Sequence, residues 1–202
     1  MELFKEKLIS QYKQIHETKS YGNTSERLLY LLLPMVKEIQ PKSILDYGCG
    51  QSNLVNLLKQ ELDPNNTEDI RTYKYDPAIE AFSTLPTERV DLVTNTDVLE
   101  HIPTEDLPMV IKKILELGEK AIFVICNREA KEILADGSNA HCSVYPPEWW
   151  LELIRQEAGF AKLVPWPVKS TCCITTWDTK SVGGKFDLIV KYLAGNLNKY
   201  LK

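Results

Sequence analysis

The residues best suited to chemistry gather in the segment ILDYGCGQSNL, residues 44–54. Asp46, Gly48 and Gly50 lie there between an apolar run and the start of a helical pattern. Glycines at such a turn let a ligand approach the backbone closely, and the helix that follows offers free N–H groups. In parallel sheets, ligands bind beyond the carboxyl ends of the strands. The spacing therefore predicts a ligand site at this turn.

The side chain of Asp46 distinguishes between two classes of cofactor that use such a turn. A dinucleotide would place its pyrophosphate over the turn, where a nearby carboxylate repels it. The G-x-G-x-x-G fingerprint also fails, because Asn53 occupies the third glycine position. S-adenosyl-L-methionine (SAM) carries an ammonium group on its amino-acid end, which a carboxylate attracts. The sequence therefore favours SAM over a dinucleotide, and an NAD-type oxidoreductase is the disfavoured alternative.

A second carboxylate, Asp76, follows the next predicted strand in the segment YKYDPA. At that point a carboxylate can accept hydrogen bonds from both ribose hydroxyls of a nucleoside cofactor. Pro77 then ends the strand. A glycine-rich turn that binds nothing is the alternative interpretation, and the addition of Asp76 makes it the weaker one.

Proton removal from a methyl acceptor needs a base, and the chain has three histidines, His16, His101 and His141. His101 follows a predicted strand in DVLEHI, and His141 precedes the Trp-rich segment PPEWW. We predict His101 and His141 as the catalytic candidates. The alternative for His101 is a structural role, in which its ring bonds the backbone and holds its loop.

The DVLEH segment also permits a metal-site hypothesis. If it forms one helical turn, Asp97, Glu100 and His101 share a face at positions i, i+3 and i+4. With His141 they would supply two carboxylates and two imidazoles, an acceptable set of ligands for a divalent metal. This set remains an alternative, and the predicted site contains no metal.

Helical patterns precede the turn. One apolar stripe is formed by Phe4, Leu8, Tyr12 and Ile15. A second, buried helix is expected from near Asn23, with Glu26 placed for a capping box. Later in the chain, Thr104 is placed to cap one helix, and Pro147 and Gly159 bound another. On that helix we expect Trp150 in the core, whereas Trp149 could line the cleft.

Strand-like runs alternate with these helices, at residues 43–46, 71–75, 90–95, 121–126, 162–166 and 171–177. Such alternation predicts an α/β fold with a mostly parallel, Rossmann-like doubly wound sheet covered on both faces. Only about a dozen residues separate Pro77 from Arg89, roughly one minimal crossover. We therefore expect the third strand of the standard sheet to be stunted or missing, and an N-terminal helical cap.

These segments together resemble class I SAM-dependent methyltransferases from about residue 20 to about residue 177. The matching stretches are ILDYGCGQS, YDP, VDLVTNTDVLEHI and PPEWWLELIRQEAGF. The chain is most similar to a group of small methyltransferases with YDPA, DVLEHI and DGxNAH segments. Small-RNA 2′-O-methyltransferases are similar near DVLEH, with an E-x-x-E-H set and a later His, although Asp97 stands in the first position here.

The resemblance implies a seven-stranded fold and a set of cofactor-binding residues. Asp46, Gly48 and Gly50 would contact the methionyl part and Asp76 the ribose. The adenine contact normally comes from the third strand, and residues 82–85 are the nearest candidate. The N-terminal cap would close over SAM, and the histidines would flank the acceptor pocket. The remaining cofactor-binding residues that we predict are Tyr21, Cys49, Pro77, Asn95, Thr96 and Asp97.

Composition narrows the partners. The net charge of −4 gives no bulk electrostatic footprint for nucleic acid. The start of the sequence lacks the apolar core of a secretory signal, and no apolar run reaches the roughly 20 residues that span a bilayer. Five cysteines without C-x-x-C spacing indicate neither a zinc module nor a disulfide framework. These features favour a reducing, cytoplasmic location.

We therefore expect one methyltransferase domain over residues 1–202, with a cap at 1–40, a SAM-binding core at 41–177 and a C-terminal helix at 178–202. Its expected reaction is methyl transfer from SAM to an oxygen or nitrogen of a small or medium polar acceptor. That acceptor is a small molecule or glycan-like compound. The alternatives are an inactive SAM-binding partner subunit and a metal-assisted RNA 2′-O-methyltransferase.

Overall fold

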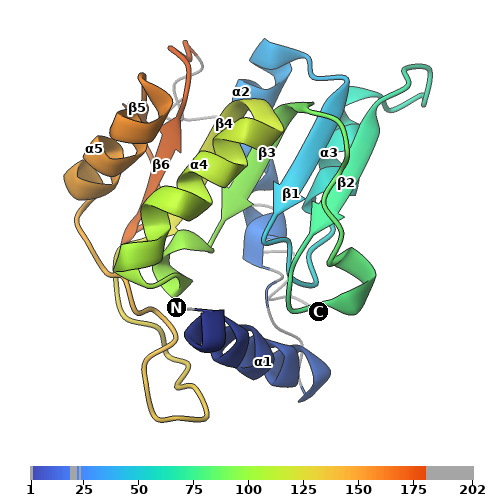
Figure 1. Cartoon of the computed structure of the whole chain (residues 1–202). Coiled ribbons are helices and arrows are strands. Elements are labelled where there is room, and N and C mark those ends of the chain that lie inside the picture. The colour runs from blue at the N-terminus through green and yellow to red at the C-terminus, as the bar shows by residue number, and fades with distance from the viewer. Residues whose placement is uncertain (1, 19–21, 23, 181–202) are drawn as a thin grey trace, which may run out of the picture.

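A six-stranded sheet with the order β2-β1-β3-β4-β6-β5 forms the centre of the molecule (Figure 1). This computed structural model describes residues 2–18, 22 and 24–180. The first four strands are parallel, and β6 runs antiparallel to both β4 and β5. The strands are β1 (Ser43–Tyr47), β2 (Arg71–Tyr75), β3 (Val90–Thr96), β4 (Gly118–Cys126), β5 (Lys162–Val164) and β6 (Thr171–Thr175).

The central strands are apolar on both faces, because helices cover each face of the sheet. Successive residues of a strand point to opposite faces. Accordingly Ile44 of β1 belongs to one apolar cluster and Leu45 to the other. Cys172 and Cys173 of β6 divide between the clusters in the same way, as their adjacency predicts. All five cysteines are free.

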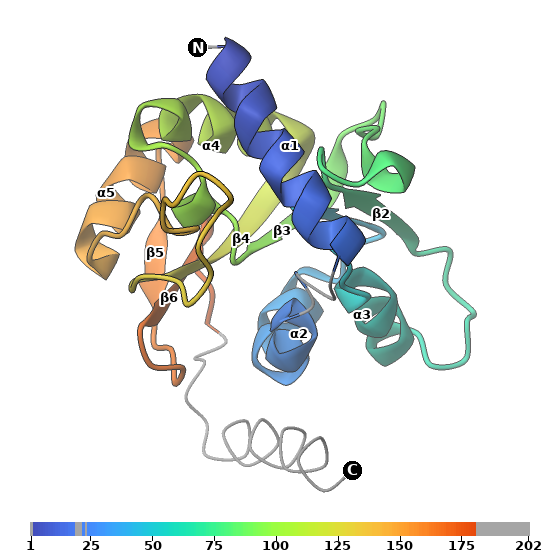
Figure 2. The same cartoon turned by 90° about the horizontal axis from the view of Figure 1, so that it is seen from below.

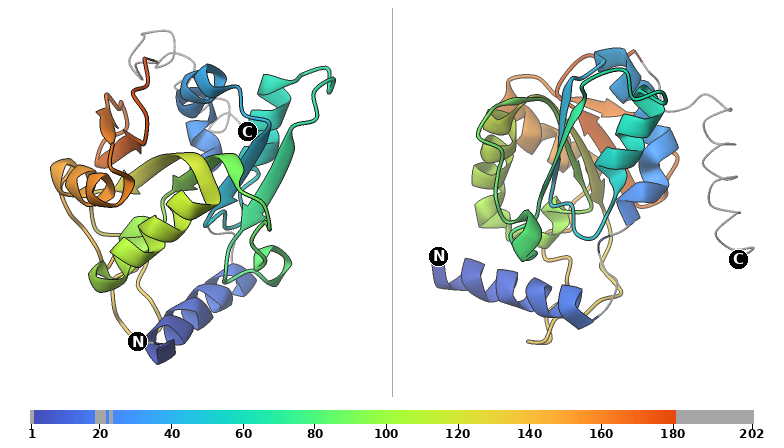
Figure 3. Two further views of the ribbon diagram at one scale, coloured as in Figure 1. Left: turned by 45° about the horizontal axis from the view of Figure 1, so that its top comes forward. Right: turned by 90° about the vertical axis from the view of Figure 1, so that its right-hand side faces the viewer.

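Two pairs of helices make the outer layers (Figures 1 and 3). One face is covered by α2 (Leu29–Ile39) and α3 (Leu54–Leu62), and the other by α4 (Leu107–Leu117) and α5 (Pro147–Ala158). The buried side chains of α2 include Leu31, Leu32 and Met35. Trp150 of α5 is fully buried, as expected. Trp149 does not line the cofactor cavity described below, because its ring stacks on Tyr145 with the centroids 3.8 Å apart.

Both predicted N-terminal caps are wrong. The turn from Thr24 to Leu28 is a 3₁₀ helix that precedes α2, and the Glu26 Oε1 accepts a hydrogen bond from the Asn53 N–H at the start of α3. Thr104 lies in a further 3₁₀ turn, Thr104–Asp106, and its hydroxyl bonds the Tyr145 hydroxyl rather than the backbone of α4. In both cases a tertiary partner competes with the local backbone for the polar side chain.

The third strand of the standard sheet is absent, as its short interval predicts. Between β2 and β3 the structure contains a 3₁₀ turn, Glu80–Phe82, and no strand, so that β2 becomes an edge of the sheet. At the other edge, only six residues separate β5 from β6, too few for a parallel crossover. The two strands therefore form an antiparallel hairpin.

The first helix, α1 (Glu2–Thr18), does not belong to either layer. It lies across the carboxyl ends of the parallel strands, beside the long segment that joins β4 to α5 (Figures 2 and 3). Thus α1 takes the position of a cap, whereas α2 packs in the core. The expected C-terminal helix falls almost wholly at residues 181–202, outside the described residues. None of the described helices is both long and apolar enough to cross a bilayer.

Candidate active site

The turn between β1 and α3 has the geometry that its glycines predict. Gly48 and Gly50 adopt φ values of 77° and 51°, which side-chain-bearing residues rarely adopt. A Cβ on Gly50 would lie 2.7 Å from the backbone oxygen of Gly22. The N–H groups of Gly48 and Cys49 donate to the Tyr75 carbonyl at the end of β2, at 2.7 and 3.0 Å. The turn is therefore fixed against both the N-terminal segment and β2.

Asp46 lies behind this turn at the end of β1, with only 1% of its surface exposed. Its Oδ1 accepts a hydrogen bond from the Thr94 hydroxyl at 2.9 Å, whereas its Oδ2 is buried without a hydrogen-bond partner. Burial raises the pKa of Asp46 to about 7. A buried carboxylate oxygen without a partner is costly, and a cationic group bound at the turn would remove that cost.

Asp76 joins the turn to the segment after β2. Its Oδ2 accepts a hydrogen bond from the Gly50 N–H and its Oδ1 one from the Ala78 N–H, both at 2.9 Å. Each carboxylate oxygen can accept more than one bond. Asp76 therefore holds the backbone of the turn and retains acceptor capacity toward a ligand.

A cavity of about 230 Å³ opens in front of these residues. Its walls come from α1, the turn after β1, the segment after β2 and the segment after β3. Of the predicted site residues, six line it: Gly48, Gly50, Asp76, Pro77, Asp97 and His101. The wall from α1 consists of Leu8, Ile9, Tyr12 and His16.

Other predicted cofactor residues are not in the cavity wall. Asn95 is fully buried, and its Nδ2 donates to the Tyr47 carbonyl at 2.9 Å, so that it braces β3 against β1. Thr96 and Cys49 are buried beside the cavity, and burial raises the pKa of the Cys49 thiol. Asp46 also lies behind the wall. Tyr21 falls outside the described residues.

His101 is held by two partners on its Nδ1 atom. The Ala140 carbonyl oxygen and the Tyr12 hydroxyl each lie 2.8 Å from that nitrogen. Since a carbonyl oxygen can only accept, Nδ1 must carry the proton. Burial and the neighbouring His141 lower the pKa of His101 to about 4, so that the ring is neutral near pH 7. Its Nε2 is then a hydrogen-bond acceptor on a residue of the cavity wall.

His141 lies behind His101, with the ring centroids 4.6 Å apart and the planes nearly perpendicular. Its Nδ1 donates to the Arg128 carbonyl at 2.6 Å, and His141 does not line the cavity. The structure thus places one predicted catalytic histidine at the cavity and the other next to it.

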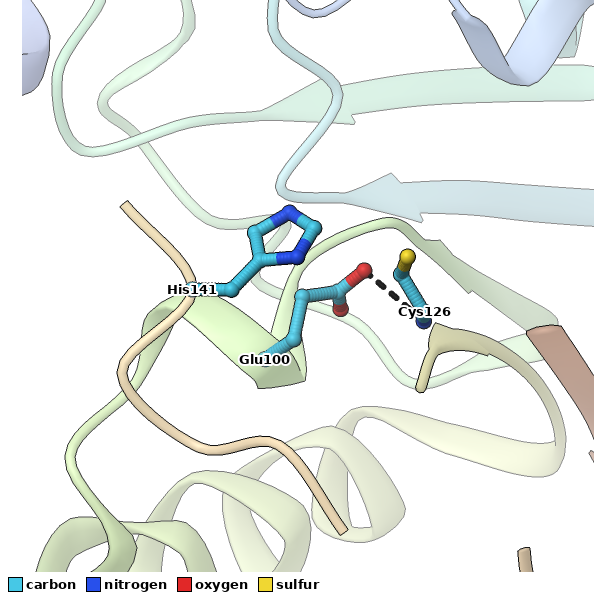
Figure 4. Close-up of side chains that lie close together, drawn as sticks. All are labelled: Glu100, Cys126 and His141. Carbon is cyan, nitrogen blue, oxygen red and sulfur yellow. Dashed lines mark hydrogen bonds between the residues drawn. The ribbon is translucent and has the colours of Figure 1, made fainter. Parts of the chain in front are cut away.

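The metal-ligand set that was kept as an alternative is not assembled. Among the described residues, the ligand atoms that lie within 4.8 Å of one another belong to Glu100, Cys126 and His141 (Figure 4). Asp97 adopts φ 55° and precedes the 3₁₀ turn Leu99–His101, so the segment is not one helical turn from Asp97 to His101. The Asp97 carboxylate accepts instead from the Thr24 hydroxyl.

Glu100, a member of the alternative metal set, is not in the cavity wall. It is fully buried, and its Oε1 accepts from the Cys126 N–H at 2.9 Å, as the dashed line in Figure 4 marks. Burial and the nearby Asp97 raise its pKa well above the usual value. Glu100 thus connects the segment after β3 to the end of β4.

Sequence reasoning predicted a cap over SAM, but not which side chains of α1 line the cavity. Tyr12 belongs to the apolar stripe that the helical spacing identified, and nothing in that spacing distinguishes a core position from a cavity wall. His16 was placed in the cap but was not predicted as a site residue. The signal available was that both residues carry a polar end on an otherwise apolar stripe.

A family model described as a methyltransferase domain matches residues 20–164, more than half of the chain. The chain therefore belongs to the methyltransferase-domain family. The class is that of the SAM-dependent methyltransferases, and the cofactor is S-adenosyl-L-methionine. No curated protein sequence matches the chain.

Solved structures with the same fold share little sequence with the chain. Mitomycin 7-O-methyltransferase MmcR has 10% identity and a TM-score of 0.51, over 73% of this chain and 53% of that one. The DhpI–SAH complex has 11% identity and a TM-score of 0.50, over 83% and 95% of the two chains. PH0226 from Pyrococcus horikoshii OT3 has 11% identity and a TM-score of 0.50, over 80% and 97%. At 10% to 11% identity these likenesses show the fold alone. The chain spans only 53% to 56% of the length of MmcR and of two other matched structures.

The residues present fit SAM in two respects. Gly48 and Gly50 contribute only backbone to the cavity wall, and the Asp46 Oδ2 lacks a hydrogen-bond partner behind the turn. Gly48, Gly50 and Asp46 would hold the methionyl end, and Asp76 the ribose. When bound, SAM supplies a methyl group that its sulfonium already activates.

Proposed function

We propose that this chain transfers the methyl group of SAM to an oxygen or nitrogen of a small or medium polar acceptor, with His101 as the base. The observation that carries the proposal is the state of His101. Its ring is neutral, its proton lies on Nδ1, and its Nε2 carries a free lone pair on a residue that lines the cofactor cavity. A base must reach the proton that it removes through such a lone pair.

The lining of the cavity supports a small acceptor. It includes Leu8, Ile9 and Tyr12 of α1 as well as Val98 and Ile102 after β3, so that an acceptor would lie between α1 and the sheet. Apolar walls with a few polar groups are typical of small-molecule sites. We take a small-molecule or glycan-like acceptor as the preferred partner, and the negative net charge disfavours a nucleic acid.

The whole chain would act as one methyltransferase domain, in which α1 is the cap and α2 belongs to the core together with residues 41–177. The absence of disulfides among five cysteines supports a reducing compartment, for which we propose the cytoplasm. The likeness to DhpI, whose structure is a complex with SAH, supports S-adenosylhomocysteine (SAH) as a probe of the site.

The test uses labelled SAM and small-molecule fractions of a cell extract. We expect label in a small-molecule product, and we expect His101→Gln to lower the transfer rate by about 10²- to 10⁴-fold, the usual contribution of a general base. SAH affinity, measured by calorimetry, should change by less than about three-fold, because no cofactor-holding group is removed. His141→Gln should lower the rate less, since His141 does not line the cavity.

Three outcomes would contradict the proposal. Equal losses of rate and SAH affinity in His101→Gln would make His101 a structural residue. No label transfer to any fraction, with SAH bound normally, would favour the inactive partner subunit. Activity that disappears in excess EDTA and returns with a divalent metal would favour the metal-assisted alternative.

A further inference from the structure

Helix α1 contacts three separate parts of the site. Near its end, the His16 carbonyl accepts a hydrogen bond from the Gln51 side chain of the cofactor turn, at 3.0 Å. Near its start, the Lys7 ammonium pairs with Asp136 of the segment between β4 and α5, at 2.9 Å. Between them, Tyr12 reaches His101. As Figure 2 shows, α1 crosses the carboxyl ends of the parallel strands, where these parts meet.

The contact of Tyr12 is a triangle of three polar atoms. The Tyr12 hydroxyl lies 2.8 Å from the Nδ1 of His101 and 3.0 Å from the Ala140 carbonyl oxygen, and Nδ1 lies 2.8 Å from the same oxygen. The carbonyl has no proton, so both Tyr12 and His101 donate to it. The Tyr12 oxygen in turn offers a lone pair to the Nδ1–H. The ring of His101 is thus held by two acceptors on one nitrogen.

This arrangement selects one orientation of the His101 ring. A half-turn of the imidazole would place a carbon atom against both oxygens, and the other tautomer would set a lone pair of Nδ1 against the lone pairs of the Ala140 carbonyl. Either change loses the bonds that Nδ1–H makes. The edge of the Tyr12 ring also packs on the imidazole, with centroids 5.4 Å apart at 78°, which favours the observed orientation sterically.

We propose that Tyr12 is a positioning residue, which fixes His101 in the Nδ1–H form and thereby presents Nε2 to the cavity. The catalytic purpose of this role rests on the proposed function, but the tautomer itself does not. Tyr12 comes from α1, and Ala140 comes from the segment between β4 and α5. Both partners of the His101 Nδ1 are therefore present only when α1 lies across the carboxyl ends of the strands. The element that encloses the acceptor is also the one that orients the base.

The tautomer can be measured without knowing the acceptor. Protein labelled with ¹⁵N in its three histidines gives two-bond ¹H–¹⁵N spectra that distinguish Nδ1–H, Nε2–H and charged rings. Substitution of each histidine by Gln assigns the signals. In the wild-type chain with SAH at pH 7.5, we expect His101 in the Nδ1–H form. In Tyr12→Phe, we expect about a five-fold rise in the ratio of Nε2–H to Nδ1–H, as the loss of one hydrogen bond gives.

Tyr30→Phe is the matched control, because it removes a tyrosine hydroxyl from α2, which packs in the core away from His101. It should leave the ratio as in the wild type. SAH affinity of Tyr12→Phe should stay within two-fold, since the aromatic ring remains in the wall. That measurement also shows that the variant is folded.

Two results would overturn the proposal: a wild-type His101 in the Nε2–H form, or a Tyr12→Phe spectrum equal to that of Tyr30→Phe. If Tyr12→Phe does not fold, the wild-type spectrum alone still tests the tautomer. Failure of the proposed function has a different signature. In that case the ratio of Nε2–H to Nδ1–H in His101 would still rise in Tyr12→Phe, while His101→Gln would leave methyl transfer unaffected.

Discussion

Gly50→Ala offers a sharp test of the cofactor turn. At Gly50, φ is 51°, and an added Cβ would lie 2.7 Å from the Gly22 oxygen and 2.9 Å from the Gly22 Cα. Real Cβ atoms do not approach backbone this closely, and no rotamer change can relieve a contact between two backbones. The turn or the segment at Gly22 must move, and the cavity wall moves with it.

Gly137→Ala supplies a matched control for the cost of φ itself. Gly137 has φ 84°, and nothing lies within 4 Å of its added Cβ. In both variants the alanine must adopt the left-handed conformation, which costs about 1–2 kcal/mol. Only Gly50→Ala adds overpacking, typically about 1–3 kcal/mol. We therefore expect Gly50→Ala to lower the free energy of unfolding by about 1–3 kcal/mol more than Gly137→Ala does.

Urea denaturation measures the two stabilities, and calorimetry measures the affinity for SAH. Gly50→Ala should weaken SAH binding by about ten-fold or more, because the displaced turn includes the N–H that donates to Asp76. Gly137→Ala should leave that affinity within two-fold, since Gly137 does not line the cofactor cavity. Equal destabilisation by the two variants, with SAH affinity preserved in both, would refute the close packing of Gly50 on Gly22.

Two further predictions concern the carboxylates. With the pKa of Asp46 raised to about 7, binding of an ammonium group favours the ionised form, so SAH affinity should fall by up to about ten-fold per unit as pH drops below 7. Calorimetry from pH 5.5 to 8 measures this slope, and a slope that persists in Asp46→Asn would show that another group is responsible. Asp76→Ala removes two backbone hydrogen bonds to a charged acceptor, each worth about 1.5–3 kcal/mol. We expect a loss of about 3 kcal/mol in urea denaturation and much weaker SAH binding, and unchanged values for both would mean that neither bond matters.

Periodicity was enough to predict the sheet and its layers. Strand β2 was predicted at its observed bounds, and the missing third strand followed from the short interval before β3. The antiparallel order at the last two strands was not predicted, since an apolar run carries no direction. The antiparallel order depends on the short connection between β5 and β6. The sequence analysis predicted each strand separately and did not use the length of that connection.

Local signals failed where a polar side chain had a distant partner. Glu26 has the spacing of a capping box, yet its carboxylate bonds the Asn53 N–H 27 residues away. Asn95 follows the family pattern for a cofactor contact, yet its Nδ2 donates to the Tyr47 carbonyl of β1 and the residue is not in the cavity wall. Spacing along a chain specifies which residues can share an element, but not which tertiary donor competes for an oxygen.

The site was predicted best where backbone geometry determines it. Gly48 and Gly50 have positive φ values, which glycine adopts readily. The two glycines of the turn therefore indicated this backbone geometry from the sequence alone. The contact of Tyr12 with His101 could not be predicted, because it depends on α1 lying across the sheet and on a carbonyl of residue 140. No local pattern places those two segments together.

Loss of the third strand has a consequence for the association of these molecules. The outer side of β2 presents N–H and C=O groups that no neighbouring strand satisfies. A strand of another molecule can pair with such an exposed edge strand, which leads to aggregation. Here that edge strand is only five residues long and bears Arg71, paired with Glu88, and Lys74, whose ammonium lies 4.1 Å from the centre of the Phe82 ring. A strand that paired with β2 would have to desolvate the charged groups of Arg71 and Lys74, which disfavours aggregation through this edge strand.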